Sequence, residues 1–512
     1  MAPNEAVTNP PSVSSTEEPI SCAAPAPAPA PAVMDIILYW NAVALEANRE
    51  AHTVENGEQR GPTLSARALG IVHLAMHDAF FAIEGGHAPY MSLPENPPGT
   101  PVPSGKNTAA AVSAAACTAL SALYPSQRPK FEAAVLGVDI PAADAAVSNA
   151  FGRAVARQMI AKLMIKAGEP GVSDLGYEAS FAHGLHRQDP DNPDQGFYGP
   201  FFGETASPLA VTKPHELDAP PQPGTAGYDA ALAEVIAKGG ATALKSTTRT
   251  PEETLIGLYW AYDGVKKIGT PPRLYNQIVR RIAQDKGNDP AANARLFALV
   301  NVAMADAGKY AWLEKFKHDL WRPVLGVRES DPSMGPTGTP GSTLNGMGDP
   351  FWLPLGAPKT NESGAKSFTP NFPAYPSGHA TFGAAAFQMV RRFYGEKEGC
   401  LSAGDSRKPD TICFDFVSDE LNGISVDSNG TVRPRHKRHF KSLWHAIFEN
   451  GLSRVFLGVH WIFDAFDASD VKNGDNFKDS DDITYDAKVG GVRLGLDIAD
   501  DIFDTGMKAS PL

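Results

Sequence analysis

The sequence predicts an all-α protein with two helical bundles in one compact molecule and long irregular loops. Three observations lead to this prediction. Apolar residues recur at helical spacing in many segments, the alternation typical of strands is scarce, and long polar stretches rich in proline separate the periodic segments. A chain of 512 residues is also long enough to bury more than one domain-sized core.

The elements follow in chain order. Residues 1–34 carry an Ala-Pro repeat, so we expect a disordered, extended arm there. The periodic segments predict helices near residues 35–48, 64–84, 107–123, 143–167, 226–238, 252–264, 273–285, 290–318, 378–395, 437–465 and 489–506. We assign residues 35–245 to an N-terminal bundle, 246–506 to a C-terminal bundle that carries the functional site, and 507–512 to a tail. Residues 168–225, 324–371 and 396–435 are expected to form long loops.

Composition limits the possible partners. The net charge of −13 argues against binding to nucleic acid or to an anionic membrane surface. Every predicted helix is interrupted by charges, so we expect no membrane spans. The four cysteines are too few for a disulfide framework, although Cys400 and Cys413 could close a loop in an oxidising compartment, and a reduced pair fits equally well. The first residues do not have the basic start and apolar core of a secretory signal.

Three segments of the second half carry groups that bind a tetrahedral oxyanion. They are Lys315-x6-Arg322-Pro323, Pro376-Ser377-Gly378-His379, and Ser453-Arg454-x3-Gly458-x-His460-x3-Asp464. Together they supply three cations, a hydroxyl, a glycine amide and two imidazoles. Arginine binds oxyanions through a planar fork, and lysine acts as a compact point charge. The segments therefore predict a site for phosphate or vanadate.

The spacing predicts how the first two segments fold. Lys315 and Arg322 are seven residues apart, so we expect both on one face of a helix that Pro323 ends at about Arg322. Pro376 and Gly378 precede a run of good helix formers. The segment around Gly378 is therefore expected at a helix start, where free amides and the helix dipole favour an anion.

The third segment is expected to lie within the helix 437–465. Arg454 and Gly458 then share one face at a spacing of four residues, and so do His460 and Asp464. On an ideal helix Arg454 and His460 are about 120° apart. They converge only if the arginine is long enough to reach, or if the helix departs from ideal geometry near Gly458.

In this order and spacing, the three segments resemble the signature of a superfamily that unites vanadium haloperoxidases with type 2 phosphatidic-acid phosphatases and related acid phosphatases. Further stretches, at residues 38–41, 64–70, 259–264, 269–277 and 372–383, resemble the fungal vanadium chloroperoxidases. The resemblance extends from about residue 35 to the C-terminus, and on it the chain is identified as a member of that group. It implies two helical bundles, the second with the site.

The resemblance also implies a role for each site residue. His460 is expected to be the protein ligand of vanadium, and His379 the acid–base histidine opposite it. The residues expected to bind the vanadate oxygens are Lys315, Arg322, Ser377, Gly378 and Arg454. Trp312 and Phe372 resemble aromatic residues on the halide side, where the bromoperoxidase branch tends to have histidine at the position of Phe372. Asp263 resembles an acidic residue that pairs with Arg454.

The activity implied is that of a vanadium chloroperoxidase. It uses hydrogen peroxide to oxidise chloride or bromide to hypohalous acid, which then halogenates small organic acceptors. His379 would move protons, and Lys315 would draw electron density from the reacting oxygen. The cofactor, vanadate, acts as a Lewis acid. Similar fungal enzymes are found outside the cell without an evident signal peptide, which favours a secreted over a cytoplasmic protein.

Two alternatives use the same sequence differently. A soluble acid phosphatase of the superfamily would form a phosphohistidine at His460, with His379 protonating the leaving group. A non-catalytic helical scaffold is expected to have lost at least one of the seven signature residues, and all seven are present. His73 and His77 have a spacing that can bind zinc, but no third ligand lies nearby in the sequence, so we interpret them as structural.

Overall fold

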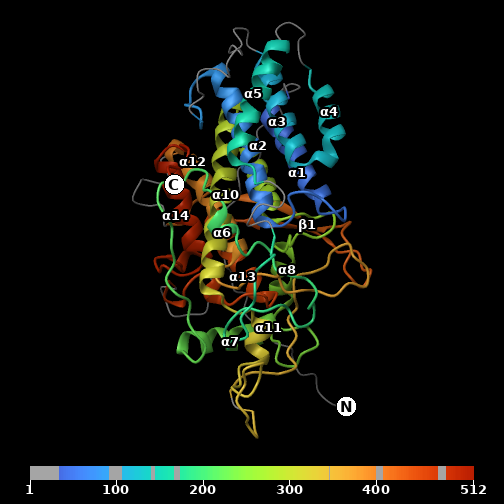
Figure 1. Ribbon diagram of the computed structural model, residues 1–512, viewed down its shortest axis with the longest axis vertical. Coiled ribbons are helices and arrows are strands. Elements are labelled where there is room, and N and C mark those ends of the chain that lie inside the picture. Colours follow the sequence, from blue (N-terminus) through green and yellow to red (C-terminus); the bar gives the residue numbers. More distant parts are fainter. Residues whose placement is uncertain are drawn as a thin grey trace, which may run out of the picture. The chain divides into compact units, whose positions relative to one another are not determined.

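The computed structural model describes residues 34–91, 107–139, 145–165, 173–344, 346–398, 408–470 and 480–512. Residues 33–512 form one compact unit, whose described part is mostly helical (Figure 1). The predicted arm, apart from its last residue, lies outside the described residues. The division into bundles at residue 245 stays a prediction.

The helices begin and end close to the predicted positions. Their bounds are α1 Ile36–Ala51, α2 Pro62–Glu84, α3 Thr108–Leu123, α4 Arg128–Leu136, α5 Ala145–Leu163, α6 Phe202–Thr205, α7 Ala226–Gly239, α8 Pro251–Tyr259, α9 Pro271–Asp285, α10 Pro290–His318, α11 Pro323–Arg328, α12 Gly378–Glu398, α13 Leu443–Phe456 and α14 Gly490–Asp504. Sequence analysis did not predict the helices α4, α6 and α11. α11 begins one residue before the polar stretch 324–371 and occupies its first residues, and the rest of the described stretch is irregular, as expected.

A small sheet replaces part of one predicted helix. β1 (Phe414–Asn422) pairs antiparallel with β2 (Arg435–Phe440), with Phe414 opposite Phe440. The prediction that the chain is helical from residue 437 to 465 is therefore wrong at both ends. The side chains of the segment 435–440 alternate between exposed and less exposed positions, as expected for a strand at the molecular surface. The segment carries five basic residues, so the spacing of apolar residues could not distinguish a strand from a helix there.

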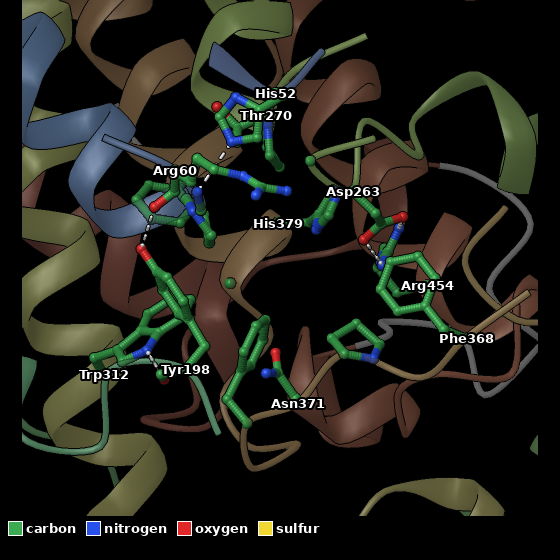
Figure 2. A pocket seen from close by; sticks show the side chains of 18 of the residues that line it. His52, Arg60, Tyr198, Asp263, Thr270, Trp312, Phe368, Asn371, His379 and Arg454 are labelled. Carbon is green, nitrogen blue, oxygen red and sulfur yellow. Dashed lines mark hydrogen bonds and ion pairs between the residues drawn. The ribbon is translucent and has the colours of Figure 1, made fainter. Parts of the chain in front are cut away.

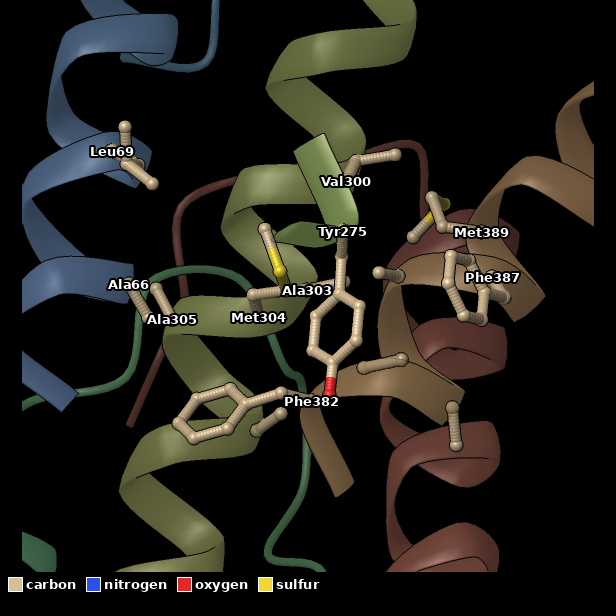
Figure 3. Packing of buried hydrophobic residues seen from close by; sticks show 14 of the residues in the cluster. Ala66, Leu69, Tyr275, Val300, Ala303, Met304, Ala305, Phe382, Phe387 and Met389 are labelled. Atoms are coloured by element: carbon tan, nitrogen blue, oxygen red, sulfur yellow. The ribbon is translucent and has the colours of Figure 1, made fainter. Parts of the chain in front are cut away.

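α10 is the central helix of the compact unit. α2 packs along one side of it and α12 along another (Figure 3). Small residues meet where α2 and α10 contact each other, and a Cβ atom at Gly70 of α2 would be in van der Waals contact with the Cβ of Ala305 in α10, at 3.4 Å. The last turn of α10 carries Lys315, so this packing places one end of a long buried helix at the predicted site.

α14 holds the start of α12 in place. A Cβ atom at Gly495 would lie 2.3 Å from the carbonyl oxygen of Thr381, and one at Gly491 would lie 2.5 Å from that of Ser377. Only glycine therefore permits this distance between the two helices. The close packing positions the Ser377-Gly378-His379 segment.

Only α2, among the helices in the described ranges, is long and apolar enough to cross a membrane, with a mean hydropathy of 1.2 over 18 residues. The expectation of no such span is wrong for this helix by length and composition. Of that window, 89% is buried inside the protein, as in a core helix. Cys117 is free and Cys413 is disulfide-bonded, whereas Cys400 lies outside the described residues.

The two histidines of α2 are buried and make hydrogen bonds within the core. His73 contacts the side chain of Asn41 and the carbonyl oxygen of Leu69, and His77 contacts Asp78. Across the described ranges, no group of three or more His, Cys, Asp or Glu side chains could hold a metal ion.

Asp306 of α10 provides a test of the core. Its carboxylate accepts hydrogen bonds from the backbone amides of Leu209, Ala210 and Val211, at 2.5, 2.8 and 2.9 Å. We expect Asp306→Ala to leave three buried donors unsatisfied, each at a cost of about 1–3 kcal/mol. For a unit of this size, that lowers the melting temperature by about 3 °C or more. Glu132→Ala, which removes an exposed carboxylate, should leave the melting temperature unchanged. Equal melting temperatures for the two variants would contradict this role.

Candidate active site

Lys315 is fully buried at the end of α10. Its Nζ donates to the carbonyl oxygens of Pro373, Ala374 and Pro376, at 2.8, 3.0 and 2.5 Å. These three acceptors immediately precede the Ser377-Gly378-His379 segment, so one ammonium group joins the first two predicted segments.

Arg322 does not share a helix with Lys315, and that prediction is wrong. Asp319 adopts a left-handed conformation (φ 47°) and ends α10, and Arg322 is the extended residue before Pro323, which begins α11. Proline is well suited to the first position of a helix, because its missing N–H would have no helical partner there. The two cations meet because the chain turns between them.

The guanidinium of Arg322 spans the site. Its Nε donates to the carbonyl oxygen of Phe372 at 2.8 Å, and its Nη1 donates to that of Val459 at 2.8 Å. Nη1 also lies 2.9 Å from Nε2 of His460. The buried Nη2 has no hydrogen-bond partner among the described residues.

The third segment leaves the helix before the histidine. α13 ends at Phe456, and Gly458 has a φ of +69°, where a Cβ atom would lie 2.2 Å from the carbonyl oxygen of Gly239. Arg454 is thus in the last turn of α13 and His460 follows in a turn. The expected helix through residue 465 is wrong, and the departure from helical geometry near Gly458 is confirmed. It brings Arg454 and His460 to one cavity.

Asp464 orients the imidazole of His460. Its Oδ2 lies 2.7 Å from Nδ1 of His460 and accepts from the amide of Trp461 at 3.0 Å. With the hydrogen on Nδ1, the lone pair of Nε2 faces Arg322. Tautomers are assigned from such hydrogen-bond networks. This arrangement leaves Nε2 of His460 as the ring nitrogen that faces the buried cations.

The second segment stands at a helix start, as predicted. α12 begins at Gly378, and the amide of Ser377 donates to the carbonyl oxygen of Asp464 at 2.8 Å. Nε2 of His379 lies 2.6 Å from the carbonyl oxygen of Ala261 and donates to it. The second and third segments are therefore hydrogen-bonded to each other through the backbone.

Arg454 and Asp263 form a buried ion pair. Nη2 of Arg454 lies 2.7 Å from Oδ1 of Asp263, and Nη1 lies 3.1 Å from Oδ2. Arg454 keeps Nε without a partner in the described part of the chain. The pair leaves the Nε edge of the guanidinium group for a ligand.

A cavity of about 330 Å³ joins these groups (Figure 2). Among the predicted site residues, those that line it are Asp263, Trp312, Phe372, Gly378, His379, Arg454 and His460. Lys315, Arg322 and Ser377 do not line it and are buried, with exposed fractions of 0–1%. Nζ of Lys315 lies 5.6 Å from the ring centroid of Trp312 and 5.1 Å from that of Phe372.

Burial and neighbouring charges lower the pKa values of Lys315, Arg322 and His379. Burial and then Arg322 and Arg454 lower the pKa of Lys315 well below its ordinary value. The pKa of Arg322 is lowered to about 9, mainly by burial and also by the charge of Arg454, while Asp464 opposes the shift. The pKa of His379 is well below its usual range because of burial, followed by the charge of Arg454. An anion bound here would relieve these shifts.

The donor set fits vanadate. Three cations, two unpartnered guanidinium nitrogens and one oriented imidazole suit an oxyanion that has a single protein ligand. The fit does not require the cluster of His, Cys, Asp or Glu ligands that a bare metal ion needs.

Sequence reasoning missed several residues of this cavity. His52, Arg60 and Tyr198 also line it, but they lie far from the three segments in the sequence and carry no motif. Phe368 lines it as well and lies shortly before the second segment, where no motif marks it. The part played by Asp464 had a signal, because it follows His460 by four residues within the third segment. His318, near Lys315 in sequence, is held by Glu314 at 3.0 Å and does not line the cavity.

Solved structures show the class of fold. The chain resembles a bacterial vanadium-dependent iodoperoxidase with a TM-score of 0.61 and 17% identity, covering 92% of this chain and 97% of that one. A holo-type bacterial vanadium-dependent chloroperoxidase gives a TM-score of 0.57 and 16% identity, covering 90% and 96%. The fold is that of vanadium-dependent haloperoxidases.

Sequence comparison then identifies the family. The model of the vanadium chloroperoxidase N-terminal domain matches residues 27–197, and that of the vanadium chloroperoxidase second helical-bundle domain matches residues 295–474. The vanadium chloroperoxidase of Curvularia inaequalis is 41% identical over 572 residues, covering 93% of this chain and 90% of that protein. The chain belongs to the vanadium chloroperoxidase family.

The hydrogen bond between Asp464 and His460 predicts a measurable effect on cofactor affinity. Because a carboxylate raises the basicity of the imidazole that it accepts from, we expect Asp464→Asn to weaken vanadate binding by about 10-fold to 100-fold. Equilibrium dialysis against orthovanadate measures the dissociation constant. Asp467→Asn makes the same change on a nearby carboxylate that does not touch His460, and should leave affinity as in the wild type. An unchanged constant for Asp464→Asn would contradict the orienting role.

Proposed function

We propose that this chain is a vanadium chloroperoxidase, which uses hydrogen peroxide to oxidise chloride or bromide to hypohalous acid. Membership of the family supports this activity and the vanadate cofactor. One observation of the structure carries the proposal: Lys315, Arg322 and Arg454 converge on the single oriented imidazole of His460. The phosphatase alternative is not favoured, because the relatives are haloperoxidases.

The residues of the site would hold vanadate in a defined way. Nε2 of His460 is the ligand atom, and Lys315, Arg322 and Arg454 neutralise the oxygens. The hydroxyl of Ser377 and the amide of Gly378 donate further hydrogen bonds, helped by the N-terminal dipole of α12. When bound, vanadate supplies a Lewis-acid centre that activates hydrogen peroxide towards halide.

His379 moves the protons of the reaction. Its Nε2 donates to the carbonyl oxygen of Ala261, so Nδ1 is the atom that accepts a proton from incoming peroxide. Burial and then Arg454 lower the pKa of His379, which keeps the ring neutral, and a bound anion would raise that pKa so that the ring accepts a proton more readily. Lys315, held by three carbonyl oxygens, is a preorganised charge that stabilises the electron density that develops on the reacting oxygen.

Trp312 and Phe372 form the halide side of the cavity. Their ring centroids are 4.7 Å apart, and the Cζ of Arg322 lies 5.0 Å from the ring centroid of Phe372. A halide that contacts these rings loses water, and the buried cations Lys315 and Arg322 lie close to the ring of Phe372. Phenylalanine at position 372 favours chloride over bromide.

The protein acts outside the cell, on small organic acceptors and without nucleic acid or membrane partners. The disulfide at Cys413 supports an oxidising compartment, where such bonds persist. The net charge of −13 supports the absence of nucleic-acid and anionic-membrane partners.

Halogenation of monochlorodimedone tests the function. We expect apoprotein to halogenate it with peroxide and chloride or bromide only after orthovanadate is added, and excess phosphate to suppress the activity by competition. His460→Ala should abolish halogenation while the circular dichroism spectrum is preserved. His318→Ala is the matched control and should stay active. Hydrolysis of p-nitrophenyl phosphate without halogenation would replace the proposal with a phosphatase, and activity of His460→Ala at the vanadate requirement of the wild type would overturn the ligand assignment.

Phe372→His tests the halide side. A histidine there places a polar, protonatable ring beside the reacting halide, and we expect the ratio of bromide to chloride kcat/KM to rise by about fivefold or more, a free-energy difference of about 1 kcal/mol. The ratio is measured with both halides on the same preparation. Phe351→His, at a side chain that is 84% exposed, should keep the wild-type ratio. An unchanged ratio for Phe372→His would remove this residue from the halide site.

A further inference from the structure

We propose that the cavity binds the organic acceptor itself, and that the preferred acceptor is a single-ring aromatic carboxylate whose charge pairs with Arg60 at the mouth. This inference rests on the proposed function of the same cavity. It differs from release of hypohalous acid into solution, because it predicts selection among acceptors.

The cavity has two chemically different parts (Figure 2). His379, Arg454 and His460 line the part where the halogenating species forms. Arg60 lines the cavity away from the Asp263–Arg454 pair (Figure 2). A ligand paired with Arg60 can therefore extend towards the reacting centre within the same cavity.

The walls suit a ring. Among the lining side chains, those without a polar group are Pro62, Pro271, Phe368, Pro370, Phe372 and Phe382. A volume of about 330 Å³ is at the lower end of the range for small-molecule pockets, roughly 300–1,000 Å³, and vanadate takes part of it. The remaining space fits one aromatic ring better than a fused system.

Arg60 is held in position by its neighbours. Its backbone carbonyl accepts from the hydroxyl of Tyr198 at 3.1 Å, and α2 begins two residues later. Gly61, with φ +79°, lies so close to Tyr198 that a Cβ atom would be 2.3 Å from the ring. The ring of Tyr198 in turn contacts Trp312 and Phe372, with centroids 5.9 and 6.2 Å apart. Tyr198 therefore contacts both the backbone of Arg60 at the mouth and the aromatic residues of the halide side.

Arg60 is the available cation of the lining. In the part of the chain that the structure describes it forms no ion pair, and only Nη1 is used, donating to the carbonyl oxygen of Glu55 at 2.7 Å. Arg454, the other lining cation of the arginine and lysine type, is paired with Asp263. His52 adds no charge, because burial lowers its pKa to about 4 and its two nitrogens contact the Asn48 carbonyl oxygen and the Gly61 amide. An anionic substituent therefore has one partner at the mouth.

The reaction on a bound acceptor balances with the proposed activity. Halide and peroxide give hypohalous acid, HOX. An electron pair of the ring forms the C–X bond as the X–O bond breaks towards oxygen, and the ring then loses its proton. The sum is ArH + X⁻ + H₂O₂ + H⁺ → ArX + 2 H₂O, in which peroxide is the oxidant.

A competition between two acceptors tests the proposal. 4-Hydroxyphenylacetate and 4-hydroxyphenylacetamide carry the same activated ring and differ in the charge of the side arm. Both are supplied in equal amounts to the vanadate-loaded enzyme at about pH 6, where the acid is ionised. Reagent hypohalous acid gives the intrinsic product ratio. We expect the enzyme to raise the ratio of halogenated acid to halogenated amide about threefold to tenfold above that value, the effect of one charge-assisted hydrogen bond.

Variants assign the preference to Arg60. Arg60→Gln should return the product ratio to the reagent value, and Arg60→Lys should keep part of the preference because the charge remains. Lys266→Gln removes an exposed lysine two residues from the lining residue Gly264 and should keep the full preference. Since the ratio is internal to each reaction, changes in total rate do not affect it.

A binding measurement separates this proposal from the activity. Calorimetry on vanadate-loaded protein without peroxide should show that phenylacetate binds more tightly than phenylacetamide, and that Arg60→Gln removes the difference. Vanadate must be present, because the three buried cations would otherwise bind the carboxylate.

A wild-type product ratio equal to the reagent ratio, or a preference that survives Arg60→Gln, would overturn the proposal. If Arg60→Gln alters only the chloride dependence, Arg60 attracts halide and the proposal also fails. Arg60-dependent phenylacetate binding with no halogenation would instead count against the proposed function.

Discussion

Lys315, Arg322 and Arg454 are buried together, and the repulsion among their charges is the constraint on which the rest of the site depends. Burial removes the water that would screen them. Burial, followed by Arg322 and Arg454, lowers the pKa of Lys315, and burial together with Arg454 lowers the pKa of Arg322. The protein holds them with neutral carbonyl oxygens more than with carboxylates. Lys315 has three such oxygens and Arg322 has two, whereas Arg454 alone has a bidentate carboxylate, that of Asp263. The site therefore keeps the net positive charge that an oxyanion needs.

The fold supplies those carbonyl oxygens by packing helices closely at a few glycines. Gly491 and Gly495 let α14 approach the start of α12, and Gly458 lets the chain after α13 pass beside Gly239. The contacts of α14 position the start of α12, which directly follows the carbonyl oxygens that accept from Lys315, and Gly458 precedes Val459, whose carbonyl oxygen accepts from Arg322. Cation positions are consequently set by rigid elements, which favours preorganised electrostatic catalysis over a site that rearranges.

One aromatic residue relates the chemistry to the selection of acceptors. Tyr198 contacts Trp312 and Phe372 through its ring and the backbone of Arg60 through its hydroxyl. Burial raises the pKa of Tyr198 to about 12, so it remains a neutral hydrogen-bond donor. The same side chain thus supports the halide side and the mouth of the cavity.

The sequence alone predicted the mostly helical fold and most helix positions, because apolar spacing reports burial along a continuous helix. It also predicted the residues of the three segments, whose chemical types suit an oxyanion. It predicted the wrong local structure around Arg322. Asp319, in a left-handed conformation, ends α10 before Arg322, and Pro323 begins α11 after it. The predicted extent of the helix around His460 was also wrong. From the spacing alone, it was undecided whether the side chains of Arg454 and His460 meet.

What the sequence by itself determined was the kind of groups present and the helices that carry them. Only the tertiary structure decided that Lys315 binds backbone carbonyl oxygens, that Asp464 orients His460, and that Arg60 and Tyr198 belong to the cavity. The physical reason is that these contacts join positions far apart in the chain, or depend on where a helix stops. The local spacing of apolar residues indicates neither the long-range contacts nor the residue at which a helix stops. A turn of a few residues is enough to change the direction in which the next side chain points.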